Sequence, residues 1–349
     1  MNRFPLSGAT LPLLPTVNLG SHSPMGWLLT GGRAIARGEM GSADVAEMLA
    51  DAVDIAVLDQ QRAGLDVLVD GEMSRQDFNL GFYGQIPGLV QRQNARLLGP
   101  EGHDQRGKWL VTEPLSAPDG LGVIAEFEHL LSIADRPVKA CVPGPFTLAG
   151  RLELNGVYAN RLDAAWALSP IVNRELRGLV ASGADYIYVD EPSYAVYPDH
   201  PDEYVRLFNA TVDGVAAKLG THLCFGNFRG RPVAKRSYRP MFPWVLGLKV
   251  DQLSLEFANR EMAEAELWGE FARESGKELA AGVVDVKNYW CEGAEDVAAR
   301  IRLLLKHVPD GKLWITPDCG LSQTARWAAV RKLRAMVDGS VIVRRELAG

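Results

Sequence analysis

The chain has 349 residues, of which 47% are hydrophobic and 23% charged, and its formal net charge is −6. These values are typical of a globular protein with a large core, and mixed charges argue against a nucleic-acid partner. No apolar run approaches the roughly 20 residues of a transmembrane helix, and the first ten residues do not resemble a signal peptide. Four cysteines are too few for a disulfide framework, which favours metal binding or catalysis. We expect a soluble, cytoplasmic protein that contacts no membrane. The sequence does not determine its oligomeric state.

Short β-branched runs alternate with amphipathic helical patterns along the whole chain. The predicted strands are 14–19, 65–70, 138–142, 186–190, 221–225, 252–256, 279–286 and 313–316. The predicted helices are 42–63, 121–134, 161–182, 202–219, 260–275, 294–307 and 322–337. In the first of these helices, Ser42 is a candidate N-cap, and Val45, Leu49, Ala52 and Ala56 share one face.

Eight strands alternating with helices predict one α/β domain over 1–349, a (β/α)8 TIM barrel with long loop insertions. The extra length falls in 84–120, which is rich in glycine, proline and charge, and in 229–243. A doubly wound sheet is the alternative. It usually carries a glycine-rich turn after its first strand, and residues 20–24 do not provide one.

Polar and metal-capable side chains follow nearly every predicted strand, where a barrel places its active site. In chain order they are Ser21, Glu72, the 143–145 turn, Asp190 with Glu191, His222 with Cys224, Glu256, Asp285 with Lys287, and Asp318 with Cys319. A barrel that served only as a scaffold would not need this concentration of titratable groups.

The sharpest pattern is His222-Leu223-Cys224, because residues i and i+2 of a strand point to the same side. Alone it is better explained as a small buried cysteine beside a histidine that a backbone carbonyl satisfies. Cys319 and Glu256 at two further strand ends change this balance. Two thiolates, an imidazole and a carboxylate favour tetrahedral Zn²⁺.

A catalytic zinc ion needs one replaceable ligand, and Glu256 is the weakest of the four. An incoming thiol would displace it and bind as a thiolate. The opposite side of the site would then need an acid or a group that binds the electrophile.

Five segments resemble the catalytic domain of the cobalamin-independent methionine synthase family. They are GLDVLVDGE (64–72), VDEP (189–192), HLC (222–224), LSLE (253–256) and PDCGL (317–321). The resemblance extends from about residue 16 to residue 337, and the chain is similar to short, single-barrel members that lack the N-terminal half of the full-length enzyme. It implies a barrel of the methionine synthase and uroporphyrinogen decarboxylase type, and a cytoplasmic enzyme of methionine biosynthesis.

The resemblance also implies roles for individual residues. His222, Cys224, Glu256 and Cys319 would bind zinc. The turn at Ser21 would hold the carboxylate of homocysteine through backbone N–H groups. Glu72 and Asp190 would hold its ammonium group.

Three departures leave the methyl donor open. The folate-binding segment of the family is not visible at 91–114. Lys287 stands where the family has a histidine thought to help protonate the leaving amine. Arg229, Arg231, Lys235, Arg236 and Arg239 make 229–239 a basic loop, which is either a solvated surface or a hold on an anionic partner. The donor would be methyltetrahydrofolate or a corrinoid such as methylcobalamin.

Two other functions compete with methyl transfer to homocysteine. The first is zinc-dependent alkyl transfer to another thiol, such as coenzyme M, or from a donor such as an epoxide or a methoxy-aromatic compound; the epoxyalkane–coenzyme M transferases are short relatives. The second is a non-catalytic zinc barrel or a metal-free decarboxylase. His22 is a further candidate substrate contact, and Tyr289 and Trp290 are candidates for a wall of the donor pocket or for ordinary packing.

Overall fold

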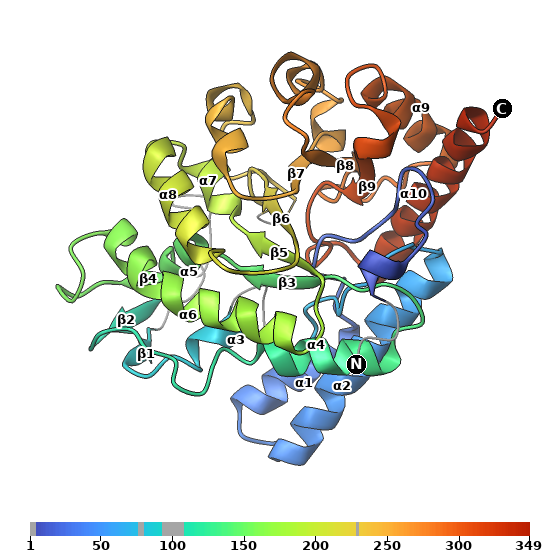
Figure 1. Ribbon diagram of the computed structural model, residues 1–349. Coiled ribbons are helices and arrows are strands. Elements are labelled where there is room, and N and C mark those ends of the chain that lie inside the picture. The colour runs from blue at the N-terminus through green and yellow to red at the C-terminus, as the bar shows by residue number, and fades with distance from the viewer. Residues whose placement is uncertain (1–4, 76–79, 93–107, 228–229) are drawn as a thin grey trace.

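The centre of the computed structural model is a parallel sheet with the strand order β3-β5-β6-β7-β8-β9 (Figure 1). The structure describes residues 5–75, 80–92, 108–227 and 230–349. The strands are β3 (Ala140–Pro143), β5 (Tyr186–Asp190), β6 (Lys218–Leu223), β7 (Gln252–Glu256), β8 (Glu278–Val284) and β9 (Leu313–Pro317). Isolated parallel bridges pair Thr16 with Ile315, Val17 with Val67 and Leu68 with Val138. These bridges close the ring between β9 and β3, and the predicted (β/α)8 barrel is confirmed.

The first two predicted strands form only these single bridges, because hydrogen bonds to side chains take the place of part of the backbone pairing between the strands. The Thr16 N–H donates to Asp66 Oδ2 at 2.8 Å, and the Asp66 N–H reaches Thr16 Oγ1 at 3.1 Å. Asn18 Oδ1 accepts the N–H of Leu19. The segments therefore lie where the sequence predicts them, but with less regular pairing.

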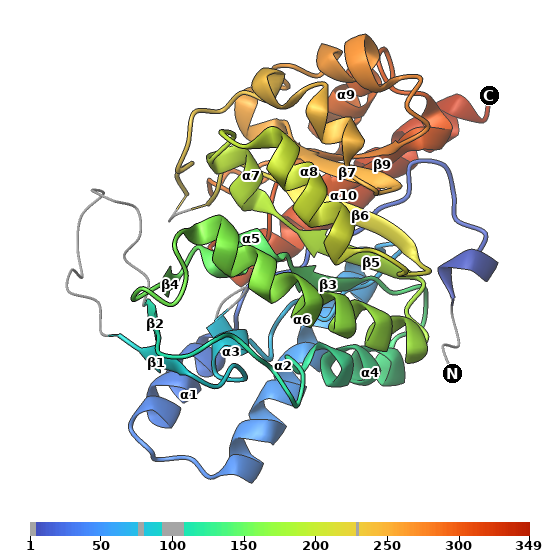
Figure 2. The same ribbon diagram turned by 60° about the vertical axis from the view of Figure 1, so that its left-hand side comes forward.

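The helices surround the barrel (Figures 1 and 2). They are α1 (Gly26–Ala36), α2 (Ser42–Ala63), α3 (Leu80–Tyr83), α4 (Val123–Ile133), α5 (Pro145–Ala149), α6 (Arg161–Ala181), α7 (Pro192–Val196), α8 (Pro201–Thr211), α9 (Ala294–Leu304) and α10 (Arg326–Leu347). Ser42 is the first helical residue of α2, whereas the N-cap position belongs to Gly41, whose N–H donates to Asp44. No helix in the described ranges is long and apolar enough to cross a bilayer.

The predicted helix 260–275 is wrong. A 3₁₀ turn (Ala258–Arg260) and a short π-helix (Trp268–Ala272) take its place. Glu261, Met262 and Glu264 have positive φ angles, a backbone region that no α-helix uses. The predicted helix 202–219 ends early at Thr211; a turn follows it, and residues 218 and 219 belong to β6.

The predicted loop 84–120 contains regular structure in its described part. Strands β1 (Leu89–Gln91) and β2 (Trp109–Val111) pair antiparallel, and β2 pairs in parallel with β4 (Leu152–Glu153). Figure 2 shows this small sheet apart from the barrel strands. Residues 93–107, and with them most of the segment compared with the folate-binding region, lie outside the described residues, as does Arg229.

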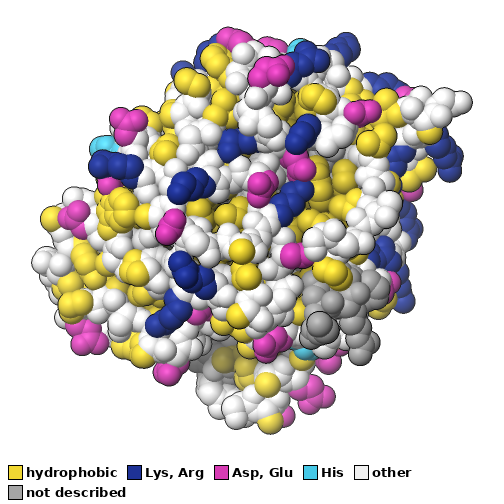
Figure 3. Space-filling view, in the orientation of Figure 1, with side chains coloured by type: hydrophobic (Ala, Val, Ile, Leu, Met, Phe, Trp, Pro, Cys, Tyr) yellow, Lys and Arg dark blue, Asp and Glu magenta, His cyan; other side chains and the backbone are white. Residues whose placement is uncertain are grey.

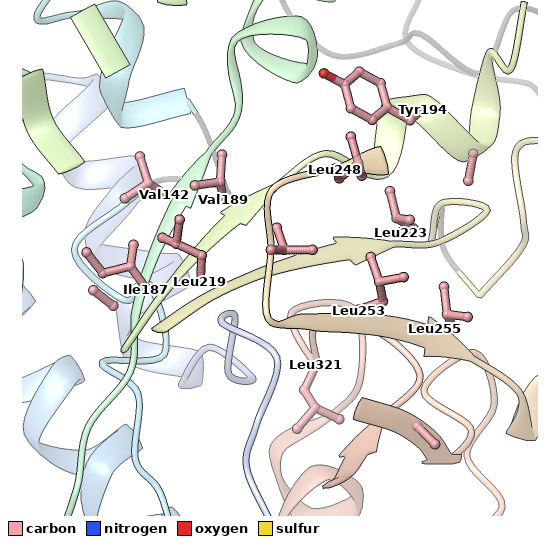
Figure 4. Packing of buried hydrophobic residues seen from close by; sticks show 14 of the residues in the cluster. Val142, Ile187, Val189, Tyr194, Leu219, Leu223, Leu248, Leu253, Leu255 and Leu321 are labelled. Carbon is pink, nitrogen blue, oxygen red and sulfur yellow. The ribbon is translucent and has the colours of Figure 1, made fainter. Parts of the chain in front are cut away.

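Alternation along each strand separates two hydrophobic clusters. Tyr186 and Tyr188 belong to the cluster inside the barrel, whereas Ile187 and Val189 belong to the layer between barrel and helices (Figure 4). Asp190 continues the inward series to the C-terminal end of β5. On the face seen in Figure 3, basic and acidic side chains are interspersed.

Candidate active site

Three soft ligands meet at the C-terminal end of the barrel. His222, Cys224 and Cys319 offer ligand atoms that all lie within 4.8 Å of one another, and the two Sγ atoms are 3.6 Å apart. His222 and Cys224 come from the end of β6 and Cys319 follows β9, so the inward period of two brings them together as predicted. We call these residues the soft-ligand group.

The charges within the soft-ligand group are arranged around Cys319. The thiols of Cys224 and Cys319 are in hydrogen-bond contact, which lowers the pKa of Cys319 well below its usual range and raises that of Cys224. Burial opposes a charge on His222, but contact with Cys319 and the nearby carboxylates raise its pKa overall. Nε2 of His222 is buried and has no hydrogen-bond partner among the described residues. The group thus brings two sulfur atoms and one imidazole together, with His222 and Cys224 buried and Cys319 partly exposed.

Glu256, the fourth predicted ligand, lies outside the soft-ligand group and forms an ion pair. Its Oε2 accepts from Lys287 Nζ at 2.6 Å, and the two side chains are 0% and 5% exposed. Its other oxygen, Oε1, is buried without a partner in the described part of the chain. Burial raises the pKa of Glu256, and interactions with Lys287 and Asn259 oppose the rise.

Asp318 binds the N–H groups of the turn that follows Glu256, a structural role that could not be predicted from the sequence. Oδ1 accepts the N–H groups of Phe257 and Ala258, and Oδ2 accepts the backbone and side-chain N–H groups of Asn259, all at 2.7–2.9 Å. These four bonds fix the turn after Glu256 to the strand end that carries Cys319.

Asp318→Ala is expected to lower the free energy of unfolding by at least about 4 kcal/mol, because it leaves four donors unsatisfied at about 1 kcal/mol or more each. Urea denaturation followed by circular dichroism measures this change. Asp338→Ala, on the exposed side of α10, is the control. Equal stability of the two variants would contradict the role given to Asp318.

A pocket joins the soft-ligand group to the predicted amino-acid site. Its lining includes Ser21, Glu72, Asp190, His222, Cys224 and Cys319, together with Leu19, Pro192, Gly226, Asn227, Gly320, Ser322 and Gln323. We call it the carboxylate pocket. All three residues predicted to hold the substrate thus face the predicted metal ligands.

Glu72 is held on both sides. The hydroxyl of Ser21 donates to Oε2, and Arg75 Nη1 donates to Oε1 at 3.0 Å. Gly20 makes this approach feasible, because it has a φ of 66° and a Cβ there would lie 2.7 Å from Glu72 Oε1. Burial raises the pKa of Glu72 to about 8, although Arg75 opposes the rise. Burial likewise raises the pKa of Asp190.

Sequence reasoning missed the support behind Glu72. Arg75 also donates to Glu126 at 2.7 Å and to the carbonyl of Cys141 at 2.8 Å. The spacing Glu72-x-x-Arg75 was visible, but Glu126 is far away in α4 and no local signal links it to this site.

Two candidates named from the sequence point away from the pocket. Glu191 is fully buried and accepts the N–H groups of Phe146 and Thr147, so it caps α5. His22 is also fully buried, and its Nε2 lies 3.1 Å from Asp59, which in turn binds Arg326. Their roles are therefore structural.

A second pocket adjoins the first through Gln323. Its other lining residues are Gly230, Val286, Lys287, Asn288, Tyr289 and Thr324, and we call it the lysine pocket. The ring of Tyr289 stacks on Trp327 with centroids 6.4 Å apart, and Trp290 is 71% exposed. In the basic loop, Arg236 donates to the carbonyl of Asn259, and Arg239 lies 3.5 Å from Glu270.

The structure is a closed (β/α)8 barrel, and its C-terminal mouth carries two cysteine side chains and one imidazole. These two features define the class of barrel enzymes to which the protein belongs. The sequence model of the family described as "Cobalamin-independent synthase, Catalytic domain" matches residues 14–341. The chain belongs to the cobalamin-independent methionine synthase family and is an enzyme of the methyltransferase class.

The relatives match along nearly their full length. The methionine synthase of Saccharolobus solfataricus is 33% identical over 341 residues, 97% of each chain. That of Thermococcus kodakarensis is 33% identical over 342 residues, covering 97% of this chain and 96% of the relative. The B12-independent methionine synthase of Shewanella sp. W3-18-1, solved in complex with selenomethionine, superposes with a TM-score of 0.82 at 27% identity, covering 96% and 99% of the two chains.

Proposed function

We propose that the protein uses zinc to activate the thiol of homocysteine and transfers a methyl group to it, which gives methionine. One observation carries this proposal. The soft-ligand group and the carboxylates Glu72 and Asp190 line the same pocket. An amino acid that carries a thiol would reach both at once.

The residues present fit zinc. Two sulfurs held at about 2.3 Å by a tetrahedral zinc ion lie about 3.8 Å apart, close to the 3.6 Å between Cys224 and Cys319. A metal would also satisfy Nε2 of His222 and Oε1 of Glu256, which are otherwise buried without partners among the described residues. His222, Cys224 and Cys319 would hold the ion with Glu256 as the exchangeable ligand, and the ion would keep an incoming thiol ionised at neutral pH.

The carboxylate pocket supplies the orientation of the substrate. Asp190 and Glu72 would accept hydrogen bonds from the substrate ammonium, and these charge-assisted bonds fix its direction. The turn at Gly20 and Ser21 would offer backbone N–H groups to the substrate carboxylate. The complex of the related Shewanella enzyme with selenomethionine supports an amino acid as the occupant.

The methyl donor would approach from the lysine pocket, which adjoins the thiol position through Gln323. There the exposed ring of Tyr289 offers apolar surface. As the substrate sulfur bonds to the methyl carbon, the bond from that carbon to the donor breaks and the donor keeps its electron pair. Methyltetrahydrofolate and methylcobalamin are the two donors to test.

The proposal is tested by metal analysis and zinc X-ray absorption, with and without homocysteine. We expect about one zinc ion per chain and replacement of an oxygen ligand by sulfur when homocysteine is added. Each donor is then supplied with homocysteine, and methionine is measured. Coenzyme M in place of homocysteine is the matched comparison, and a change of zinc ligands with coenzyme M alone would contradict the proposed acceptor.

The affinity for methionine should depend on pH through Glu72. Its pKa of about 8 means that the carboxylate must lose a proton before it can bind an ammonium group. Affinity is therefore expected to rise about tenfold per pH unit up to about pH 8 and then level off. Calorimetric titration with methionine measures this without a titrating thiol. Glu72→Gln should bind weakly and without this slope, and a flat profile for the unchanged protein would contradict the prediction.

A further inference from the structure

The ion pair of Lys287 and Glu256 is buried beside the lysine pocket. Lys287 lines the lysine pocket, and its ammonium group donates to Glu256 Oε2 at 2.6 Å. Its backbone N–H donates to Asp285 Oδ1 at 2.7 Å, which fixes the turn after β8. Glu256 ends β7, the strand next to the one that carries His222. The pair therefore connects the donor side of the site with the soft-ligand group.

Glu256 can bind in two directions. Oε2 is taken by Lys287, while Oε1 is buried and has no partner in the described chain. Glu256 also interacts electrostatically with Cys224 and Cys319. The carboxylate of Glu256 thus interacts electrostatically with the soft-ligand group and accepts a hydrogen bond from the ammonium group of Lys287.

Moving a carboxylate off a metal inside a protein is unfavourable when the released charge stays unpaired, because a buried and uncompensated ion is strongly destabilising. Glu256 has no route to solvent as it stands, since its side chain is 0% exposed. Lys287 already provides the opposite charge at hydrogen-bond distance. Lys287 would therefore compensate the charge of the carboxylate after its release from the metal.

We propose that Lys287 is a positioning residue that receives Glu256 when a thiol takes its place among the metal ligands, and so sets the balance between metal affinity and thiol affinity. This inference rests on the proposed zinc-dependent function. Lys287 keeps its proton throughout the exchange, and the proton of the incoming thiol leaves to solvent.

A proton donor for the leaving group is the competing role for Lys287. The two roles differ in what arginine can replace. Arginine pairs with a carboxylate but does not release its proton in proteins. A counter-ion role therefore predicts that Lys287→Arg keeps most of the turnover, and an acid role predicts that it loses turnover while still binding zinc and homocysteine.

The test compares the unchanged protein with Lys287→Met, Lys287→Arg and the double variant Lys287→Met/Glu256→Gln. Zinc affinity is measured by competition with a chromogenic chelator, and homocysteine affinity by zinc X-ray absorption during titration. In Lys287→Met we expect tighter zinc binding and at least about tenfold weaker homocysteine binding, with an oxygen ligand that persists. The double variant should regain homocysteine affinity, because no carboxylate has to be displaced.

Lys218→Met is the matched control. It breaks an ion pair of the same kind, with Nζ of Lys218 2.5 Å from Glu278, but both residues begin their strands at the opposite end of the barrel. It should leave both affinities unchanged.

Unchanged zinc and homocysteine affinities in Lys287→Met would overturn the inference and leave the proposed function standing. Loss of turnover in a Lys287→Arg variant that still binds zinc and homocysteine would also overturn the inference. This comparison is the deciding one if Lys287→Met does not fold. An unchanged protein that binds no zinc, or whose zinc ligands do not respond to homocysteine, would instead contradict the proposed function itself.

Discussion

Cys319→Ser should lower the affinity for zinc by at least about 100-fold and abolish methyl transfer. Changes in groups that only support a metal ligand already cost 10–100-fold, and Cys319 is itself one of the soft-ligand group. A serine hydroxyl is a harder ligand that stays protonated at neutral pH, so it replaces neither the charge nor the softness of the thiolate. Zinc content after dialysis and chelator competition measure the loss.

Cys291→Ser is the matched control for this variant. Cys291 is half-buried, and its Sγ lies near the carbonyls of Tyr289 and Ala328, outside the soft-ligand group. Its replacement should leave the zinc content unchanged. Equal zinc affinities for the two variants would remove Cys319 from the metal site.

Arg75→Met should lower the free energy of unfolding by about 3–5 kcal/mol, the usual cost of removing one partner from a buried ion pair. The side chain of Arg75 is 2% exposed and contacts Glu72, also 2% exposed, and Glu126, 15% exposed. Its loss leaves Glu126 without its cation and removes the hydrogen bond that holds Glu72. Urea denaturation with and without methionine measures both the stability and the affinity for methionine. The affinity should fall because the orientation of the Glu72 side chain is no longer fixed.

Arg302→Met provides the comparison on the surface. Arg302 pairs with Glu295 and Glu346, but its side chain is 38% exposed, and exposed pairs contribute little. No measurable loss of stability is expected from it. The double variant Arg75→Met/Glu126→Gln should recover part of the stability lost in Arg75→Met, and a further loss would contradict the assigned pairing.

The strand-end residues could be predicted because the barrel obeys two simple rules. Alternation gives one side of each strand to the interior, and parallel strands bring their C-terminal ends to one mouth. These rules place His222, Cys224 and Cys319 together, with Ser21, Glu72 and Asp190 beside them.

The rules fail where side chains decide the local structure. Glu191 and His22 stand at strand ends, yet hydrogen bonds to Thr147 and Asp59 hold them elsewhere. The pairing of Arg75 with Glu126 joins segments about fifty residues apart, and periodicity carries no information about such contacts. The helix predicted at 260–275 had suitable spacing, but positive φ angles at its start exclude it.

The bridges that close the ring also determine when the site can exist. Ser21, near the start of the chain, accepts the N–H of Leu321, and the hydroxyl of Ser23 donates to the carbonyl of Thr324. During synthesis on the ribosome, the pocket therefore remains open at one side until almost the entire chain has emerged. A metal that needs Cys319 can be captured only after β9 has been synthesised, so metal loading would follow the synthesis of all the strands of the barrel.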